Sequence, residues 1–235
     1  MNTPSLESSS DLDCMSIASR PAMTSALRSK VFSEIYHYNR WRDPLSRSGR
    51  GSTPQNTPSI RAELPSLISM FGVQRFLDAG CGDFCWMNEI VLPEQVSYFG
   101  IDIVKDIIVS NNLLYENARR SFFLGDITTD LVPDSELVLC RDCLVHLPHN
   151  DIYRALANLL RGSVRYLVAT TFPRLDVNID IRVGQWRPLN LQRTPFSFPD
   201  PIRIIPEDFP ARGRYSDKAL AVWRAEDLDL PCIRP

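Results

Sequence analysis

Short apolar runs recur through the middle of the chain, and each one stops at a turn or at a polar residue. Runs of this length predict buried strands of a sheet. The run at 164–170 shows little polar alternation, as expected for a strand that is covered on both faces. The predicted strands of this series are 76–78, 96–102, 122–127, 137–142 and 164–170.

Other segments carry apolar residues at helical spacing, which predicts amphipathic helices around this sheet. In the segment 26–41, Leu27, Val31, Ile35 and Tyr38 fall on one helical face. The other predicted helices are 57–71 with Thr57 as N-cap and Pro58 at the first position, 105–120, and 151–161 with Gly162 as its stop. Strands that alternate with helices in this way favour a parallel α/β sheet.

The ends of the chain break this regular alternation. Residues 1–25 are rich in Ser, Thr, Pro and Asp and predict a disordered tail. Residues 26–72 predict a helical lid segment, and 73–235 predict the α/β core. Within that core, the prolines of 173–201 exclude a long helix, so this part predicts an irregular insert. Two further strands are predicted beyond the insert, at 202–205 and 219–224.

A glycine turn directly after the first strand predicts a ligand pocket. Asp78 ends the strand, and Gly80 and Gly82 allow the backbone to turn tightly and to approach a ligand. Asp83 closes the turn, and its charge argues against a phosphate ligand. Hydroxyls, amines or a cationic ligand suit these acids better.

Later strands bring further polar groups to the same edge of the predicted sheet. Asp102 ends the second strand, 24 residues beyond Asp78, where an acid typically binds a ribose diol. Asp126 ends the third strand, and Arg141 and Asp142 follow the fourth. The carboxyl ends of parallel strands meet at one edge, so these side chains predict a nucleoside pocket there.

With these motifs the chain resembles the class I S-adenosylmethionine (SAM) dependent methyltransferases over roughly residues 30–230. The resemblance rests on 78–82, Asp102, 125–127 and 140–142. The stretches 32–41, 48–52 and 184–191 look like a small, largely bacterial branch of that superfamily, whose substrate is unknown to us. The chain departs from the widest pattern at Phe84, where a third glycine is common.

The resemblance implies a Rossmann-like, seven-stranded, mostly parallel sheet with helices on both faces and an antiparallel C-terminal hairpin. It also implies SAM as the cofactor, with an acid after the third strand beside the adenine amine. The expected cofactor-binding residues are Asp78, Gly80, Gly82, Asp83, Asp102, Ile103, Asp126, Ile127 and Arg141.

Candidate catalytic residues lie after the fourth strand. Asp142 could act as the general base for a hydroxyl acceptor, and His146 could accept a proton near neutral pH. Arg141 and Asp142 could equally form a local ion pair that shapes the pocket. The acceptor pocket is expected to use side chains outside the sheet repeat, although Trp186 could instead anchor the insert. These candidates are Trp41, Trp186, Arg187 and Asn190.

The composition of the chain limits which partners, location and metal sites are expected. The formal net charge of −2, from 26 basic and 28 acidic residues, gives no electrostatic footprint for nucleic acid. No apolar run is long enough for a membrane span, and no signal sequence is recognisable, so a cytoplasmic protein is expected. The six cysteines fit reduced thiols. Cys140, Cys143 and His146 have plausible spacing for a metal site, but a single such cluster favours ordinary packing, and no metal is expected.

The sequence therefore predicts a SAM-dependent methyltransferase that acts on a small-molecule or glycan acceptor, at a hydroxyl group. Two alternatives remain open. One is a nicotinamide-dependent oxidoreductase, whose pyrophosphate would need small, uncharged residues where Asp83 and Phe84 stand. The other is a non-catalytic SAM-binding protein that has the same fold.

Overall fold

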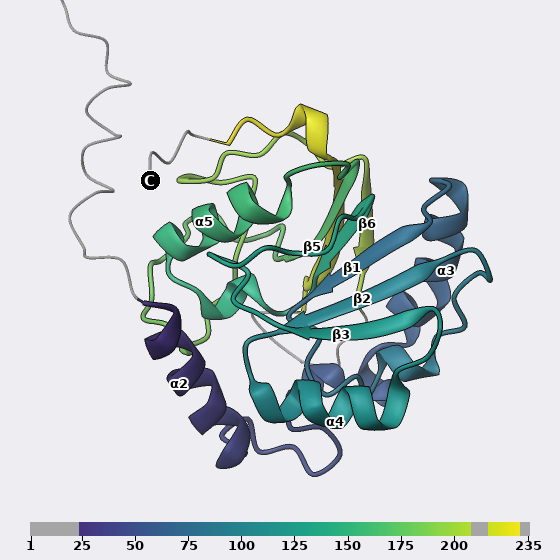
Figure 1. Cartoon of the computed structure of the whole chain (residues 1–235). Helices are drawn as coiled ribbons and strands as arrows, with labels where there is room; N and C mark the ends of the chain where they lie inside the picture. Colours follow the sequence, from purple (N-terminus) through teal and green to yellow (C-terminus); the bar gives the residue numbers. More distant parts are fainter. Residues whose placement is uncertain (1–23, 208–215, 231–235) are drawn as a thin grey trace, which may run out of the picture.

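Seven strands form a single sheet in the computed structural model, which describes residues 24–207 and 216–230 (Figure 1). Their order across the sheet is β3-β2-β1-β4-β5-β7-β6. The strands are β1 (Arg75–Ala79), β2 (Ser97–Asp102), β3 (Arg120–Leu124), β4 (Leu137–Cys140), β5 (Tyr166–Thr171), β6 (Arg203–Pro206) and β7 (Ala219–Arg224). The predicted fold class is confirmed.

Strand directions follow the prediction as well. The first five strands are parallel, whereas β7 pairs antiparallel with both β5 and β6. The residues predicted for the last strand, 219–224, are those of β7. The third strand begins two residues earlier than predicted and ends at Leu124, so Asp126 lies in the loop that follows β3.

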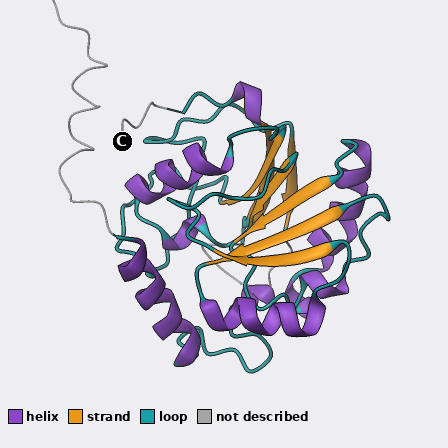
Figure 2. Cartoon of the chain, viewed as in Figure 1, coloured by secondary structure: helices purple, strands orange, loops and turns teal. Residues whose placement is uncertain are grey.

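Within the described ranges, four α-helices lie around the sheet (Figure 2). They are α2 (Ser25–His37), α3 (Pro58–Met70), α4 (Lys105–Tyr115) and α5 (His149–Leu159). Thr57 stands at the N-cap of α3 and Pro58 begins the helix, as predicted, but the Thr57 hydroxyl donates to the carbonyls of Thr53 and Pro54 and makes no capping bond to the helix. The predicted helix 105–120 was too long, since the chain turns after Tyr115 to enter β3.

Short 3₁₀ turns complete the regular structure. They are η2 (Arg50–Ser52), η3 (Pro54–Asn56), η4 (Met87–Glu89), η5 (Leu144–His146) and η6 (Ala225–Asp227). Between β1 and β2 the chain forms η4 and no α-helix.

The two faces of the sheet have different covers. In β4, Leu137 and Leu139 face one core, which α3 and α4 cover. Val138 and Cys140 face the other core, which α5 and apolar residues of the irregular segment fill. This strict alternation explains why both faces of the central strands are buried.

Helix α2 lies beyond the carboxyl ends of the strands rather than on a face of the sheet (Figure 1). The helical face predicted for it is right only in part, because Ile35 is buried, whereas Leu27 is 46% and Tyr38 is 73% exposed. Instead Arg28, Phe32 and Tyr36, spaced four residues apart, line a cleft at the edge of the sheet. The helix therefore forms one wall of the cleft, while the role of 26–72 as a lid stays a prediction.

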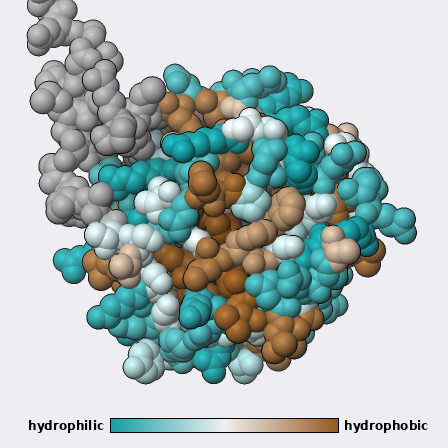
Figure 3. Space-filling model, viewed as in Figure 1, coloured by the Kyte–Doolittle hydropathy of each residue, from teal (hydrophilic) through white to brown (hydrophobic). Residues whose placement is uncertain are grey.

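Hydrophobic side chains also reach the surface in the view of Figure 3, in the region of α4 and β3. Leu113 and Leu114 of α4 and Leu124 of β3 are exposed. Within the described ranges, no helix is long and apolar enough to cross a membrane.

Candidate functional site

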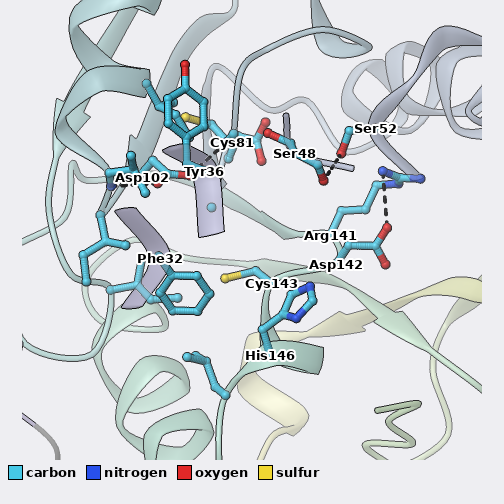
Figure 4. Close-up of a pocket in the computed structure, with 18 of the residues that line it drawn as sticks. Phe32, Tyr36, Ser48, Ser52, Cys81, Asp102, Arg141, Asp142, Cys143 and His146 are labelled. Atoms are coloured by element: carbon cyan, nitrogen blue, oxygen red, sulfur yellow. Dashed lines mark hydrogen bonds and ion pairs between the residues drawn. The ribbon is translucent and has the colours of Figure 1, made fainter. Parts of the chain in front are cut away.

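The cleft at the carboxyl edge of the sheet has about 980 Å³ of empty volume, part of it open to solvent. In Figure 4, Asp102 and Tyr36 lie toward one end of it, and Arg141 and Asp142 toward the other. Among the predicted cofactor-binding residues, eight line this cleft: Asp78, Gly80, Gly82, Asp102, Ile103, Asp126, Ile127 and Arg141.

The glycine turn shapes the floor of the cleft. Gly80 and Gly82 have φ angles of 83° and 57°, which side chains of L-residues rarely adopt. A Cβ on Gly80 would lie 2.8 Å from Cys143 Sγ, and a Cβ on Gly82 would collide with Ser48. Both positions therefore require glycine.

Asp102 is fixed at the end of β2 by the backbone. Gly82 N donates to Oδ2 at 3.1 Å, and Val104 N donates to Oδ1 at 2.9 Å. Each carboxylate oxygen can accept a further bond, so the group can still bind two vicinal hydroxyls. Burial raises the pKa of Asp102 to about 6, although these backbone bonds oppose the rise.

Asp78 is buried below the turn, where the hydroxyl of Tyr98 donates to Oδ2 at 2.8 Å. Burial raises the pKa of Asp78 to about 7, against the opposing effects of Tyr98 and Arg141. Neither Asp78 nor Asp102 has an ion-pair partner in the part of the chain that the structure describes. The cleft therefore gathers negative charge when both are ionised.

Asp126 belongs to a buried ionic cluster that sequence reasoning missed. Its Oδ2 accepts from Arg28 Nε at 2.8 Å, and the same guanidinium donates to Asp151 at 3.1 Å. Thr128 donates to Oδ1 through its backbone and its hydroxyl. Burial opposes ionisation, but these bonds hold the pKa of Asp126 below its usual range. Because three donors already occupy this carboxylate, its contact with an adenine amine stays a prediction.

Arg141 and Asp142 are joined to residues far along the chain. Arg141 Nε donates to Glu207 at 2.7 Å, and its Nη2 donates to the carbonyl of Gly51 at 2.8 Å. Lys218 Nζ lies 2.5 Å from Asp142 Oδ2 and 3.1 Å from Glu207 Oε2. Burial alone would raise the pKa of Asp142, but Lys218 and Arg141 lower it to about 2. So low a pKa makes Asp142 a weak proton acceptor.

His146 lies at the end of η5 and is nearly buried. Its Nδ1 lies 3.0 Å from the carbonyl of Gln185, which can only accept, so the neutral ring carries its proton on Nδ1. Nε2 is then left as the acceptor atom. Burial lowers the pKa of His146 below its ordinary value, so the ring is neutral at pH 7.

A second pocket opens beside the cleft and shares Trp41, Ser48, Asp142 and His146 with it. The rings of Trp41 and His146 are 5.0 Å apart between centroids. Trp186 and Phe172 line the far side of this second pocket, together with Lys218. The structure therefore brings the predicted Trp41 and Trp186 to one pocket.

The other two predicted acceptor residues hold the insert together. Arg187 donates to the carbonyls of Ile179, Leu144 and Leu147, and burial lowers its pKa to about 10. Asn190 donates to the carbonyls of Pro173 and Leu175. Neither residue lines the cleft or the pocket beside it.

Asp83 also points elsewhere, because its carboxylate accepts from Ser46 Oγ at 2.9 and 3.0 Å. Its backbone N–H donates to Ser48 Oγ at 2.9 Å. These bonds tie the segment 46–48 to the glycine turn. Asp83 thus places Ser48 at the cleft without lining it.

Several lining residues were absent from the sequence prediction: Arg28, Phe32, Tyr36, Ser48, Ser52, Trp86, Thr128 and Cys143. The i, i+4, i+8 spacing of Arg28, Phe32 and Tyr36 was the one signal that could have found the first three. Across 24–207 and 216–230, no group of three or more His, Cys, Asp or Glu side chains could hold a metal ion.

Solved structures share this architecture at low sequence identity. The N-methyltransferase NodS from Bradyrhizobium japonicum WM9, in complex with S-adenosyl-L-homocysteine, aligns with a TM-score of 0.57 at 14% identity, over 81% of this chain and 97% of NodS. The magnesium protoporphyrin IX methyltransferase ChlM from Synechocystis PCC 6803, with bound SAM, aligns with a TM-score of 0.53 at 13% identity, over 88% and 99%.

The methyltransferase domain of the bacterial protein CtHen1 gives a TM-score of 0.51 at 11% identity, over 72% of this chain and 99% of that domain. No family model and no curated protein matches the sequence. At identities this low the likeness establishes the fold: the chain has the fold of the class I SAM-dependent methyltransferases.

Proposed function

We propose that this protein is an enzyme that transfers a methyl group from SAM to a hydroxyl of a small-molecule or glycan acceptor. The observation that carries the proposal is Asp102, a half-buried carboxylate that lines the cleft and that Gly82 and Val104 hold by one backbone N–H each. Structures of this fold with bound SAM or S-adenosyl-L-homocysteine support the choice of ligand.

The residues present fit such a cofactor. Asp102 would bind the ribose hydroxyls, and Ile103 and Ile127 offer apolar surfaces for a base. Asp78 supplies a second carboxylate without an ion-pair partner among the described residues, which suits a cation. SAM supplies a methyl group on a positively charged sulfur, so alignment of donor and acceptor matters more than a protein nucleophile.

His146 is the residue that we assign to proton removal from the acceptor hydroxyl. Its Nδ1–H is directed to Gln185, which leaves Nε2 to accept a proton. His146 lines both the cofactor cleft and the adjoining pocket, so it stands where the two ligands would meet. Asp142, which is paired with Lys218, would stabilise the protonated imidazole through its charge.

The lining of the adjoining pocket supports an acceptor that carries a ring. Asp142 and Lys218 are paired with each other, and Arg50 is the third charged side chain of the lining. The aromatic faces of Trp41 and Trp186 suit a ring, including the apolar face of a sugar. A cytoplasmic location is part of the proposal, supported by the free thiols of Cys81, Cys85, Cys140 and Cys143.

The decisive experiment measures binding and transfer separately. Calorimetry should show binding of SAM and S-adenosyl-L-homocysteine but not of NAD. Incubation with radiolabelled SAM and a panel of phenols and glycosides should yield labelled methyl ethers. His146→Ala should reduce transfer by about 10²–10⁴-fold while it keeps the affinity for S-adenosyl-L-homocysteine. The exposed His37→Ala is the matched control.

The alternatives predict other results. A nicotinamide-dependent enzyme would bind NAD, yet the glycine turn here precedes η4 and not an α-helix, whose N-terminus would hold a pyrophosphate. A non-catalytic protein would bind SAM and transfer nothing to any acceptor. Binding of NAD without SAM would refute the proposal.

A further inference from the structure

An outer groove adjoins the acceptor pocket and shares two side chains with it. Phe172 and Trp186 line both cavities, and their rings pack edge to face with centroids 6.0 Å apart. The cofactor cleft, the acceptor pocket and the outer groove therefore form one series, each sharing side chains with the next.

The surface of this groove is largely apolar. Val177 is 68% exposed, Ile179 is 69% exposed and Trp186 is 45% exposed, and all three line the groove with Leu175. Exposed apolar side chains scattered singly are ordinary, but a group of them in one concave site indicates a binding surface.

The charged side chains of the groove are already engaged. Arg174 binds Asp217 through its backbone N–H at 2.7 Å and through an ion pair at 3.6 Å. Arg187 donates to three carbonyls. Asp176 lies 3.5 Å from Arg193. The groove therefore offers a ligand apolar surface beside charged side chains that are already paired, of which Arg174 and Asp176 stay exposed.

Resting on the proposed function, we infer that the acceptor is an elongated amphipathic molecule. Its hydroxyl-bearing ring occupies the pocket between Trp41 and Trp186, beside His146. Its apolar tail passes Trp186 and lies in the outer groove against Val177 and Ile179. The Phe172 and Trp186 side chains, which the groove shares with the acceptor pocket, are what select an acceptor tail as the occupant over a separate protein partner.

The test uses two series of probes with growing tails: 4-alkylphenols from methyl to heptyl, and n-alkyl β-D-glucosides from methyl to octyl. Affinity is measured by calorimetry in the absence of SAM, and kcat/KM for methyl transfer is measured alongside. In one of the two series, each added methylene should raise the affinity roughly three- to fourfold until the groove is filled.

The double variant Val177→Ser/Ile179→Ser removes the apolar surface at two exposed positions, where folding tolerates the change. It should reduce the ratio of long-tail to short-tail affinity by at least tenfold. Val91→Ser/Leu131→Ser is the matched control, because these side chains are 87% and 92% exposed and line none of the three cavities. The control should keep the ratio of the wild-type protein.

The two readouts separate this inference from the proposed function. Tail-dependent affinity that the groove variant abolishes supports the inference even if no methyl transfer occurs. Methyl transfer or binding that is indifferent to tail length in both series overturns it. An equal loss of the ratio in the control variant would also overturn it, because the tails would then bind elsewhere.

Discussion

Two carboxylates, the buried Asp78 and the half-buried Asp102, set the chemistry of the cleft at the scale of single residues. Burial raises the pKa of Asp102 to about 6 and of Asp78 to about 7, while the surrounding hydrogen bonds hold both in place. Their ionisation therefore falls within the range of ordinary buffers, where it can be measured.

Asp102→Ala should weaken binding of S-adenosyl-L-homocysteine by about tenfold or more, since hydrogen bonds to charged groups contribute about 1.5–3 kcal/mol each. In the wild-type protein the affinity should fall as the pH drops from 7.5 to 5, because protonation of Asp102 removes an acceptor of the ribose hydroxyls. Calorimetry across this range checks both effects. Asp106→Ala, on an exposed side chain, is the control. An unchanged affinity in Asp102→Ala would remove this residue from the site.

The raised pKa of Asp78 predicts that this residue makes the folded protein less stable as the pH rises. An ordinary salt-bridged acid has the opposite effect. Its pKa is about 7 in the folded protein and 3.8 as its ordinary value, so the folded state binds the extra proton between these limits. The free energy of unfolding contributed by Asp78 is therefore highest below about pH 4 and is lost as the pH rises to about 7.

Asp78→Asn should remove this loss, because an amide oxygen can still accept from Tyr98. At pH 8 the ligand-free variant should be more stable than the wild-type protein by an amount on the order of 1–4 kcal/mol. Urea unfolding at pH 5 and pH 8 measures it, with Asp106→Asn as the control. A variant that is less stable at pH 8 would show that Asp78 is held ionised by its surroundings.

At the scale of elements, α2 depends on one buried cation. Arg28 joins this helix to Asp126 and Asp151, which lie 98 and 123 residues away along the chain. Removal of one partner from a buried ionic cluster typically costs about 3–5 kcal/mol, because a charge is left without compensation.

Arg28→Met should therefore destabilise the protein by about 3 kcal/mol or release α2 from the cleft. Thermal unfolding gives the first effect, and amide hydrogen exchange over 25–37 gives the second. Arg40→Met, at an exposed side chain outside the helix, should change neither. Wild-type stability together with wild-type protection of α2 would contradict the role given to Arg28.

In the insert beyond β5, the structure predicts that Arg187 stabilises the fold, whereas the sequence predicts that it contacts the acceptor. Arg187 is buried and bonded to three carbonyls, so Arg187→Met leaves these acceptors unsatisfied. We expect a loss of about 2–4 kcal/mol in the free energy of unfolding, and a fall in methyl transfer that follows the folded fraction. The exposed Arg182→Met is the control. A stable Arg187→Met protein that binds SAM but transfers nothing would instead return Arg187 to the acceptor site.

For the molecule as a whole, the sequence predicted the sheet well and the walls of the site poorly. Apolar runs and the acids after them are local signals, so β1, β2 and Asp102 could be located from the chain alone. Arg28 is buried because of partners far away in the sequence, and no local pattern carries that information. The sequence predicts Arg187 at the acceptor, whereas in the structure its guanidinium donates to three backbone carbonyls, and such partners have no sequence signature.

The contact between the insert and α2 at Gly184 should couple the binding of the two ligands. This glycine has a φ of 81°, and a Cβ there would lie 2.6 Å from Val31 and 3.0 Å from Ile35, so the insert packs closely against α2. The adjoining side of α2, with Arg28, Phe32 and Tyr36, lines the cofactor cleft, while the insert carries Trp186. A ligand that orders either element reduces the conformational entropy that the second ligand must still remove. Cofactor and acceptor should therefore raise each other's affinity by the same factor, since such linkage is reciprocal.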